Sequence, residues 1–61
     1  MNINDLIGKT FEQAFALCKG HNYIIRITKE DNINCAITTD FQFNRVNVEI
    51  EKGIITKCDI G

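Results

Sequence analysis

The sequence has no serine and only one histidine, and both facts bear on catalysis. A nucleophile of the Ser-His-Asp or Cys-His kind needs a base held within hydrogen-bonding reach. His21 follows the end of a predicted helix and has no orienting partner in the sequence around it. The four glycines are scattered, so there is no glycine-rich loop to bind phosphate. We therefore predict that the chain is not an enzyme and uses no cofactor.

Long apolar runs and clusters of basic residues are also missing. The longest apolar run, residues 14–18, is five residues, whereas a membrane-spanning helix needs roughly 18. With 7 basic and 8 acidic residues the formal net charge is -1, and no group of basic residues forms the patch that nucleic-acid binding requires. We expect neither a membrane nor a nucleic acid as partner.

The start of the chain lacks the basic residues and the apolar centre of a signal peptide. Two locations therefore stay open: the cytosol, or secretion if a leader has been removed. Three cysteines, Cys18, Cys35 and Cys58, leave at least one thiol unpaired within a single chain, and the odd count favours a reducing compartment. One disulfide, three free thiols and an intermolecular bridge all remain open.

Cys18 and His21 form a Cys-x-x-His pair, which Cys35 and Cys58 could complete as a Cys3His zinc site. A structural zinc site usually has a second close pair of ligands, and these two cysteines stand alone. We predict no metal site. Cys18 is then a residue of the helix face, and His21 is a surface residue beyond the helix end.

The 61 residues, 44% of them hydrophobic, predict one small domain over residues 1–61 with a single core. Thr10 and Gln13 fit a capping box at the start of a helix over residues 11–19. Gly20 is expected to close this helix in the left-handed conformation. One helix face is predicted to be buried: Phe11, Ala14, Phe15 and Cys18.

Three strands are predicted after the helix. Residues 23–28 are rich in β-branched side chains and should form a central strand. Residues 45–50 alternate apolar and polar side chains, so one face should lie in the core and the other in water. A turn at residues 51–53 should lead into an antiparallel partner over residues 54–60. The prediction is an α+β fold with a single helix packed on a small mixed β-sheet.

Residues 29–44 connect two of these strands and contain no glycine, no proline and no helical period. After a bend at residues 29–32, the connection is too long for a turn, and in a compact domain a connection of this length is usually functional or disordered. We predict a long exposed loop that is supported by the polar residues of the next strand, Arg45 and Asn47. Because a chain this short cannot easily leave its middle disordered, a function is the better hypothesis for this loop.

Three blocks of sequence carry a resemblance to a known family. They are Leu6-Ile7-Gly8-Lys9-Thr10, Thr38-Thr39-Asp40-Phe41 and Asn44-Arg45-Val46-Asn47-Val48, and the match extends to the closing Ile60-Gly61. In order and spacing these blocks resemble the potato inhibitor I family of serine-protease inhibitors. The Arg-x-Asn pattern is similar to a bacterial and fungal branch, whereas many plant and leech members have a second arginine at the position of Asn47.

The resemblance implies a helix on a mixed sheet with a long exposed reactive loop between two parallel strands. It aligns the reactive-site bond with Thr39 and Asp40, so that Thr39 would fill the primary specificity pocket of a protease. The other loop residues that would contact the protease are Ala36, Ile37, Thr38, Phe41 and Gln42. The implied loop supports are Arg45, Asn47 and Gly61, and support would be weaker with asparagine at position 47.

The leading hypothesis is therefore a monomeric, reversible, substrate-like inhibitor of a serine protease. A subtilisin-like or elastase-like target is favoured because Thr39 offers no positive charge to a trypsin-type pocket. The alternative is a non-inhibitory binding module on the same scaffold that uses the loop for another partner. The sequence leaves an intracellular role open for this alternative.

Overall fold

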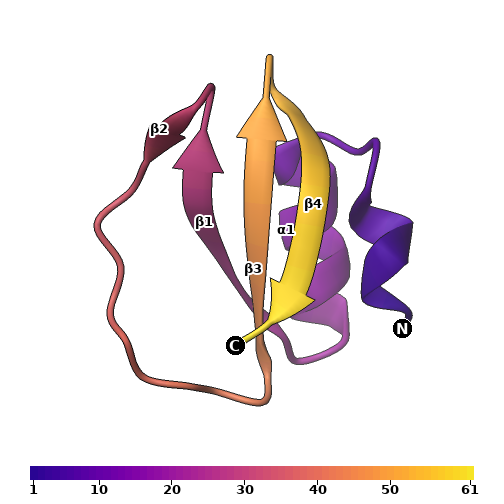
Figure 1. Cartoon of the computed structure of the whole chain (residues 1–61). Coiled ribbons are helices and arrows are strands. Elements are labelled where there is room, and N and C mark those ends of the chain that lie inside the picture. The colour runs from indigo at the N-terminus through magenta and orange to yellow at the C-terminus, as the bar shows by residue number, and fades with distance from the viewer.

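The computed structural model describes all 61 residues, and it shows one helix packed on a four-stranded mixed sheet (Figure 1). The elements are η1 (Ile3–Leu6), α1 (Phe11–Gly20), β1 (Ile24–Glu30), β2 (Ile33–Asn34), β3 (Arg45–Glu51) and β4 (Ile54–Ile60). The strand order is β2-β1-β3-β4; β1 and β3 are parallel, and the other pairs are antiparallel. The predicted α+β fold is confirmed.

Helix α1 begins as the sequence predicts. The Thr10 hydroxyl accepts from the Gln13 main-chain N–H at 3.3 Å, and the Gln13 side-chain oxygen accepts from the Thr10 N–H at 3.0 Å. These reciprocal bonds satisfy main-chain donors that the first helical turn leaves free. The capping box is thus confirmed.

The end of α1 differs from the prediction. Gly20 is the last helical residue, and Asn22 takes the left-handed conformation with φ 62°. The N–H of Tyr23 donates to the Cys18 carbonyl at 2.8 Å and that of Asn22 to the Lys19 carbonyl at 3.3 Å. This is the Schellman pattern with asparagine at the left-handed position, which asparagine tolerates better than most residues. The prediction that Gly20 takes the left-handed conformation was wrong. The rule for helix ends favours glycine at that position, but in this helix Asn22 occupies it.

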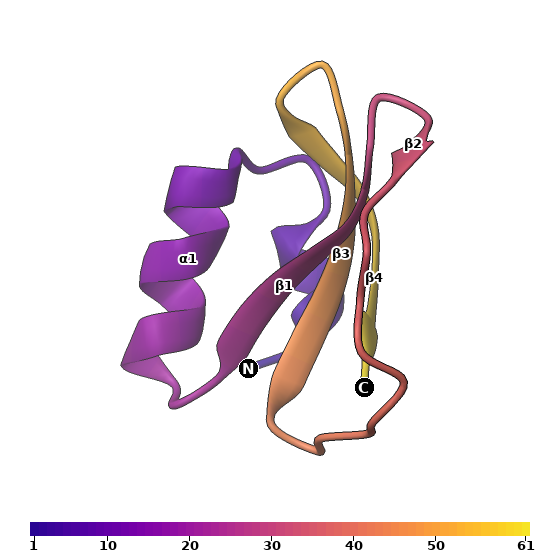
Figure 2. The same cartoon turned by 90° about the vertical axis from the view of Figure 1, so that its left-hand side faces the viewer.

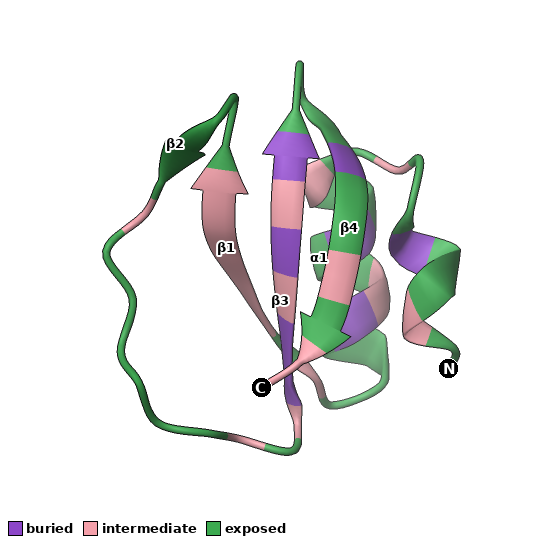
Figure 3. Cartoon of the chain, viewed as in Figure 1, coloured by how far each residue is buried: buried purple, intermediate pink, exposed green.

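The core lies between α1, η1 and one face of the sheet (Figure 3). Its buried residues are Leu6, Ala14, Cys18, Val46, Val48, Ile50 and Ile55. Burial alternates from Val46 to Glu51 of β3, as predicted, but Arg45, which was expected on the face in water, is buried. Phe15 was expected in the core but is 50% exposed, whereas Leu17 packs against the core from the other flank of the helix. The buried face is centred on the small side chains of Ala14 and Cys18, which leaves the ring of Phe15 outside, stacked against Phe11 at 6.0 Å between centroids.

Strand β1 lies between β2 and β3 and is therefore central, as predicted, although it extends to Glu30. Its partner β2 has only two residues and was not predicted. Asp31 and Asn32 join the two strands, both with positive φ (50° and 68°), as a two-residue hairpin turn requires. The Asp31 carboxylate accepts from the main-chain N–H of Lys52 at 2.7 Å and so ties this turn to the β3–β4 turn.

Residues 35–44 form no helix or strand and link β2 to β3. They swing out past the β1 edge of the sheet (Figure 1), on the side away from α1 (Figure 2), and return beneath the start of β3. Most of these residues are exposed. The connection between the parallel strands β1 and β3 is therefore long and exposed. We refer to residues 35–44 as the loop.

No helix of the protein is long and apolar enough to cross a membrane.

Candidate functional site

The loop presents large apolar side chains to solvent. Phe41 is 72% exposed and Phe43 is 81% exposed, and Ile37 is also exposed. Apolar groups concentrated on one exposed segment are typical of a surface that meets another molecule. The other residues expected to contact a partner, Ala36 and Thr38, are exposed as well, whereas Gln42 is half-buried.

Arg45 anchors the loop from the first position of β3. It is the one buried charged residue, at 7% exposed. Its Nη2 donates to the main-chain oxygen of Asp40 at 2.8 Å and to that of Gly61 at 2.7 Å, and its Nε donates to Gly61 at 3.2 Å. A buried charge is tolerated when it is paired and hydrogen-bonded, and here the guanidinium joins the loop to the end of β4.

Gly61 completes this junction. Its N–H donates to the Arg45 carbonyl at 3.0 Å, and its oxygen accepts from the Gln42 N–H at 3.2 Å. A Cβ at Gly61 would lie 3.0 Å from Nδ2 of Asn47, so only glycine fits beside that amide without a shift. The structure thus brings together Arg45, Asn47 and Gly61, the three residues that the resemblance implied as supports.

Asp40 is a carboxylate at neutral pH. The side chain of Thr38 is the largest cause that lowers the pKa of Asp40, followed by that of Gln42 and then Arg45, and together they bring it to about 2. Gln42 Nε2 lies 3.3 Å from Asp40 Oδ2, and Arg45 Nη1 lies 3.5 Å from the same oxygen. The Asp40 side chain is half-exposed, so these bonds order the loop without burying it.

Arg26 of β1 also reaches the loop, and sequence reasoning missed it. Its Nη1 donates to the Thr38 hydroxyl at 3.1 Å and lies 3.4 Å from the Thr38 main-chain oxygen. Its Nε donates to Asn47 Oδ1 at 2.8 Å. Asn47 therefore makes its side-chain hydrogen bond to Arg26 and not directly to the loop. The available signal was a single charged residue within the run Ile24-Ile25-Arg26-Ile27, whose side chain must point away from the core.

Thr39 lies between the two anchored residues, Thr38 and Asp40. It is exposed, and its side chain takes part in none of these hydrogen bonds. The loop is thus held on both sides of Thr39 while Thr39 itself points into solvent. This arrangement suits a residue that is inserted into a pocket of a partner.

The cysteines and the histidine do not form a second site. Cys18, Cys35 and Cys58 are free thiols, and no group of three or more His, Cys, Asp or Glu side chains is arranged to hold a metal ion. Burial raises the pKa of both Cys18 and Cys58. The Cys58 thiol donates to the Ile3 carbonyl at 3.1 Å, which indicates a packing role.

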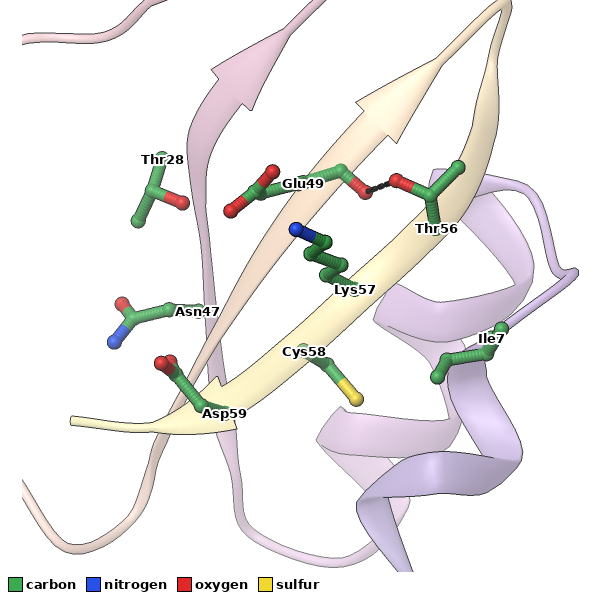
Figure 4. Close-up of a pocket in the computed structure, with 8 residues that line it drawn as sticks. All are labelled: Ile7, Thr28, Asn47, Glu49, Thr56, Lys57, Cys58 and Asp59. Carbon is green, nitrogen blue, oxygen red and sulfur yellow. Dashed lines mark hydrogen bonds between the residues drawn. The ribbon is translucent and has the colours of Figure 1, made fainter.

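A shallow groove of about 280 Å³ lies on the open side of the sheet (Figure 4). It is lined by Ile7, Thr28, Asn47, Glu49, Thr56, Lys57, Cys58 and Asp59. The Thr56 hydroxyl donates to the Glu49 carbonyl at 3.3 Å across the strand pair. Glu49, Asp59 and Lys57 place charges of both signs along the groove, and no group of side chains in it is arranged to hold a metal ion. The loop is the stronger candidate site.

No model of a known protein family matches the chain, and no curated protein matches it. The resemblance to the potato inhibitor I family therefore stays a prediction from the sequence.

Proposed function

We propose that the chain is a reversible, substrate-like inhibitor of a serine protease that presents the bond between Thr39 and Asp40 to the enzyme. One observation carries the proposal. The buried Arg45 guanidinium binds the main-chain oxygens of Asp40 and Gly61 from beneath an otherwise exposed loop. We also propose that the chain has no enzymatic activity of its own.

The physical basis of inhibition is preorganisation. A flexible peptide loses conformational entropy when it is fixed in a protease cleft, and this loss weakens binding. A loop already held by Arg45 on one side and by Arg26 on the other loses less. More of the free energy of contact then appears as affinity, although the loop offers the enzyme the same main chain as a substrate does.

The same contacts favour reversal after attack. The serine oxygen of the protease attacks the Thr39 carbonyl carbon, the bond to the Asp40 nitrogen breaks, and the new amine takes a proton. Arg45 still binds the Asp40 main-chain oxygen, so this amine stays beside the acyl group. When the amine attacks the ester, the peptide bond forms again and the serine is released. Hydrolysis is slow because the retained amine occupies the position from which a water molecule would attack the ester.

Thr39 favours a particular class of target. Its side chain is small, β-branched and uncharged, so it suits the apolar primary pocket of a subtilisin-like or elastase-like enzyme better than the acidic pocket of a trypsin-like one. The exposed Ile37 and Phe41 supply apolar contacts on either side. The partner that we propose is therefore a serine protease with an apolar pocket.

A panel of purified proteases tests this proposal. The parent chain is titrated against a subtilisin, an elastase, a chymotrypsin and a trypsin, with Thr39→Lys as the matched variant. We expect the parent to inhibit the subtilisin or the elastase, and Thr39→Lys to gain inhibition of the trypsin. If neither chain inhibits any of the four at micromolar concentration, the proposal is wrong.

The alternative is a non-inhibitory binding module on the same scaffold. The three free thiols favour it, because they fit a reducing compartment where no secreted protease is present. Under this alternative Phe41 and Phe43 would contact a different partner. The same panel separates the two functions, since the alternative predicts that no protease is inhibited.

A further inference from the structure

The chain has only two arginines, and both reach the loop. They lie on different strands, Arg26 on β1 and Arg45 on β3. Arg26 binds Thr38, before the bond between Thr39 and Asp40, and Arg45 binds Asp40, after it. The two guanidinium groups therefore bind the loop on opposite sides of this bond.

Arg26 is fixed before it meets the loop. In the parallel pairing of β1 and β3 it lies opposite Asn47, whose Oδ1 accepts from its Nε at 2.8 Å. An arginine held at Nε has few ways to turn its planar fork, so Nη1 is directed at Thr38. Both Arg26 and Asn47 are half-buried, and Asn47 also lines the groove on the open side of the sheet (Figure 4). Asn47 thus supports the loop by orienting Arg26.

The loop contacts of the two arginines lie on the two sides of Thr39. The Thr38 hydroxyl accepts from Arg26 Nη1 at 3.1 Å. Asp40 in turn is bound by Arg45 through its main-chain oxygen and, at 3.5 Å, its carboxylate. Polar contacts from two different strands therefore flank the bond between Thr39 and Asp40.

The order of these residues along the chain matters once the bond is cut. Arg26 and Thr38 both belong to residues 1–39, whereas Arg45, Asp40 and Gly61 all belong to residues 40–61. Each arginine therefore stays in the same fragment as the loop residue that it binds. The parallel pairing of β1 with β3 continues to hold the two fragments together.

We propose that Arg26 is a positioning residue that holds the Thr38-Thr39 end of the loop in place after the reactive bond is cut, as Arg45 holds the new amine. The inference rests on the proposed function. Without Arg26 the acyl end would move away from the amine, so that hydrolysis would gain over resynthesis. Asn47 acts through Arg26 and has a smaller effect of the same sign.

The first test measures resynthesis. Parent, Arg26→Gln and Lys29→Gln are each cut between residues 39 and 40, and the return of intact chain in the presence of the inhibited protease is followed by mass spectrometry. Lys29→Gln is the matched control, because it removes a positive charge from the same strand without touching the loop. We expect Arg26→Gln to slow resynthesis about tenfold, as the loss of one charge-assisted hydrogen bond predicts, and Lys29→Gln to match the parent.

A double substitution separates positioning from a general structural role. In the Thr38→Val background the hydroxyl that Arg26 binds is absent, so Arg26→Gln should add less to the effect than it does in the parent. Equal effects of Arg26→Gln in both backgrounds would show that Arg26 does not act through the Thr38 hydroxyl. The proposal would also be overturned if Arg26→Gln and Lys29→Gln resynthesised the bond equally fast.

A measurement without protease keeps this inference distinct from the proposed function. NMR relaxation of the free chain should show faster motion of the Thr38 and Thr39 amides in Arg26→Gln than in Lys29→Gln. Unchanged motion would contradict the role of Arg26. If the motion increases although the parent inhibits no protease, the ordering of the loop by Arg26 is supported, and the inhibitor function is the part that fails.

Discussion

Neighbouring residues of β3 belong to two regions that are held together in different ways. Val46, Val48 and Ile50 point into the core and are buried against α1, η1 and β4. Arg45 and Asn47 alternate with them and belong to the network beneath the loop. The core is held by apolar burial, whereas the loop is held by hydrogen bonds from arginines.

This difference separates stability from loop order. Burial of apolar surface dominates the free energy of folding, so the fold should depend mainly on the core residues. The loop buries little apolar surface, and Phe41 and Phe43 remain in solvent. Its order should therefore depend on a few polar contacts that can be removed while most of the fold is kept.

The largest effect on folding is expected in the core. Ile50→Ala removes a side chain that is 4% exposed, and the loss of contacts and the remaining cavity should lower the free energy of unfolding by about 2 to 5 kcal/mol. Glu49→Ala, on the other face of the same strand, should change it by less than about 0.5 kcal/mol. Urea unfolding measures both. Equal losses would show that the two faces of β3 do not differ in this way.

Arg45→Ala should affect the loop more than the fold. It removes the Arg45 donor from the main-chain oxygens of Asp40 and Gly61, of which only Gly61 keeps another bond, from the Gln42 N–H, at a cost of about 1 to 3 kcal/mol. The segment around Thr39 would gain freedom, and the inhibitor should become a substrate. Incubation with a protease that the parent inhibits should then show faster cleavage after Thr39 and weaker inhibition. If the variant inhibits as well and resists cleavage as long as the parent, Arg45 does not prop the loop.

Thr39→Leu should change affinity without changing either region. Thr39 is exposed and its side chain makes none of the loop's hydrogen bonds, so the folded chain should lose little stability. An added methylene in an apolar pocket is worth about 10 to 200-fold in affinity for a subtilisin-like enzyme. The inhibition constant of the variant measures this gain, with the unfolding midpoint as control. An unchanged protease profile would mean that another residue occupies the primary pocket.

The smallest effect is expected from pH. The folded loop lowers the pKa of Asp40 from 3.8 to about 2. Its contribution to loop order is therefore fully present above pH 3.8 and is lost as the pH falls from there through 2. NMR of the Thr38 and Gln42 amides should show a constant loop between pH 7 and 4 and increasing motion below. Asp40→Asn controls for the other carboxylates; an identical titration in this variant would exclude Asp40 as the cause.

The sequence predicted those parts of the fold that depend on local patterns. The capping box of Thr10 and Gln13, the alternation along β3 and the β3–β4 hairpin all appear where they were expected. The errors concern Phe15 and Gly20. Periodicity does not tell how the helix is rotated on its sheet, and the rule for helix ends does not choose between glycine and a nearby asparagine.

The candidate site was predictable only in part. Arg45 and Gly61 meet beneath the loop, as the resemblance implied, and the short strand β2 and the contact of Arg26 with the loop were missed. The contact between Arg26 and Thr38 depends on the register of β1 against β3, which places Arg26 opposite Asn47. No local pattern contains that register, because it arises from pairing between segments that are distant in sequence.

The most direct test of substrate-like inhibition starts from two states of the same chain. Intact protein and protein already cut between Thr39 and Asp40 are each incubated with a small amount of the inhibited protease, and mass spectrometry follows the two species over time. We predict that both samples reach the same mixture, with the intact chain in excess and the two fragments still associated. A cut sample that never regains intact chain, or an intact sample digested at several sites, would contradict the claim that a braced loop makes this chain a reversible inhibitor.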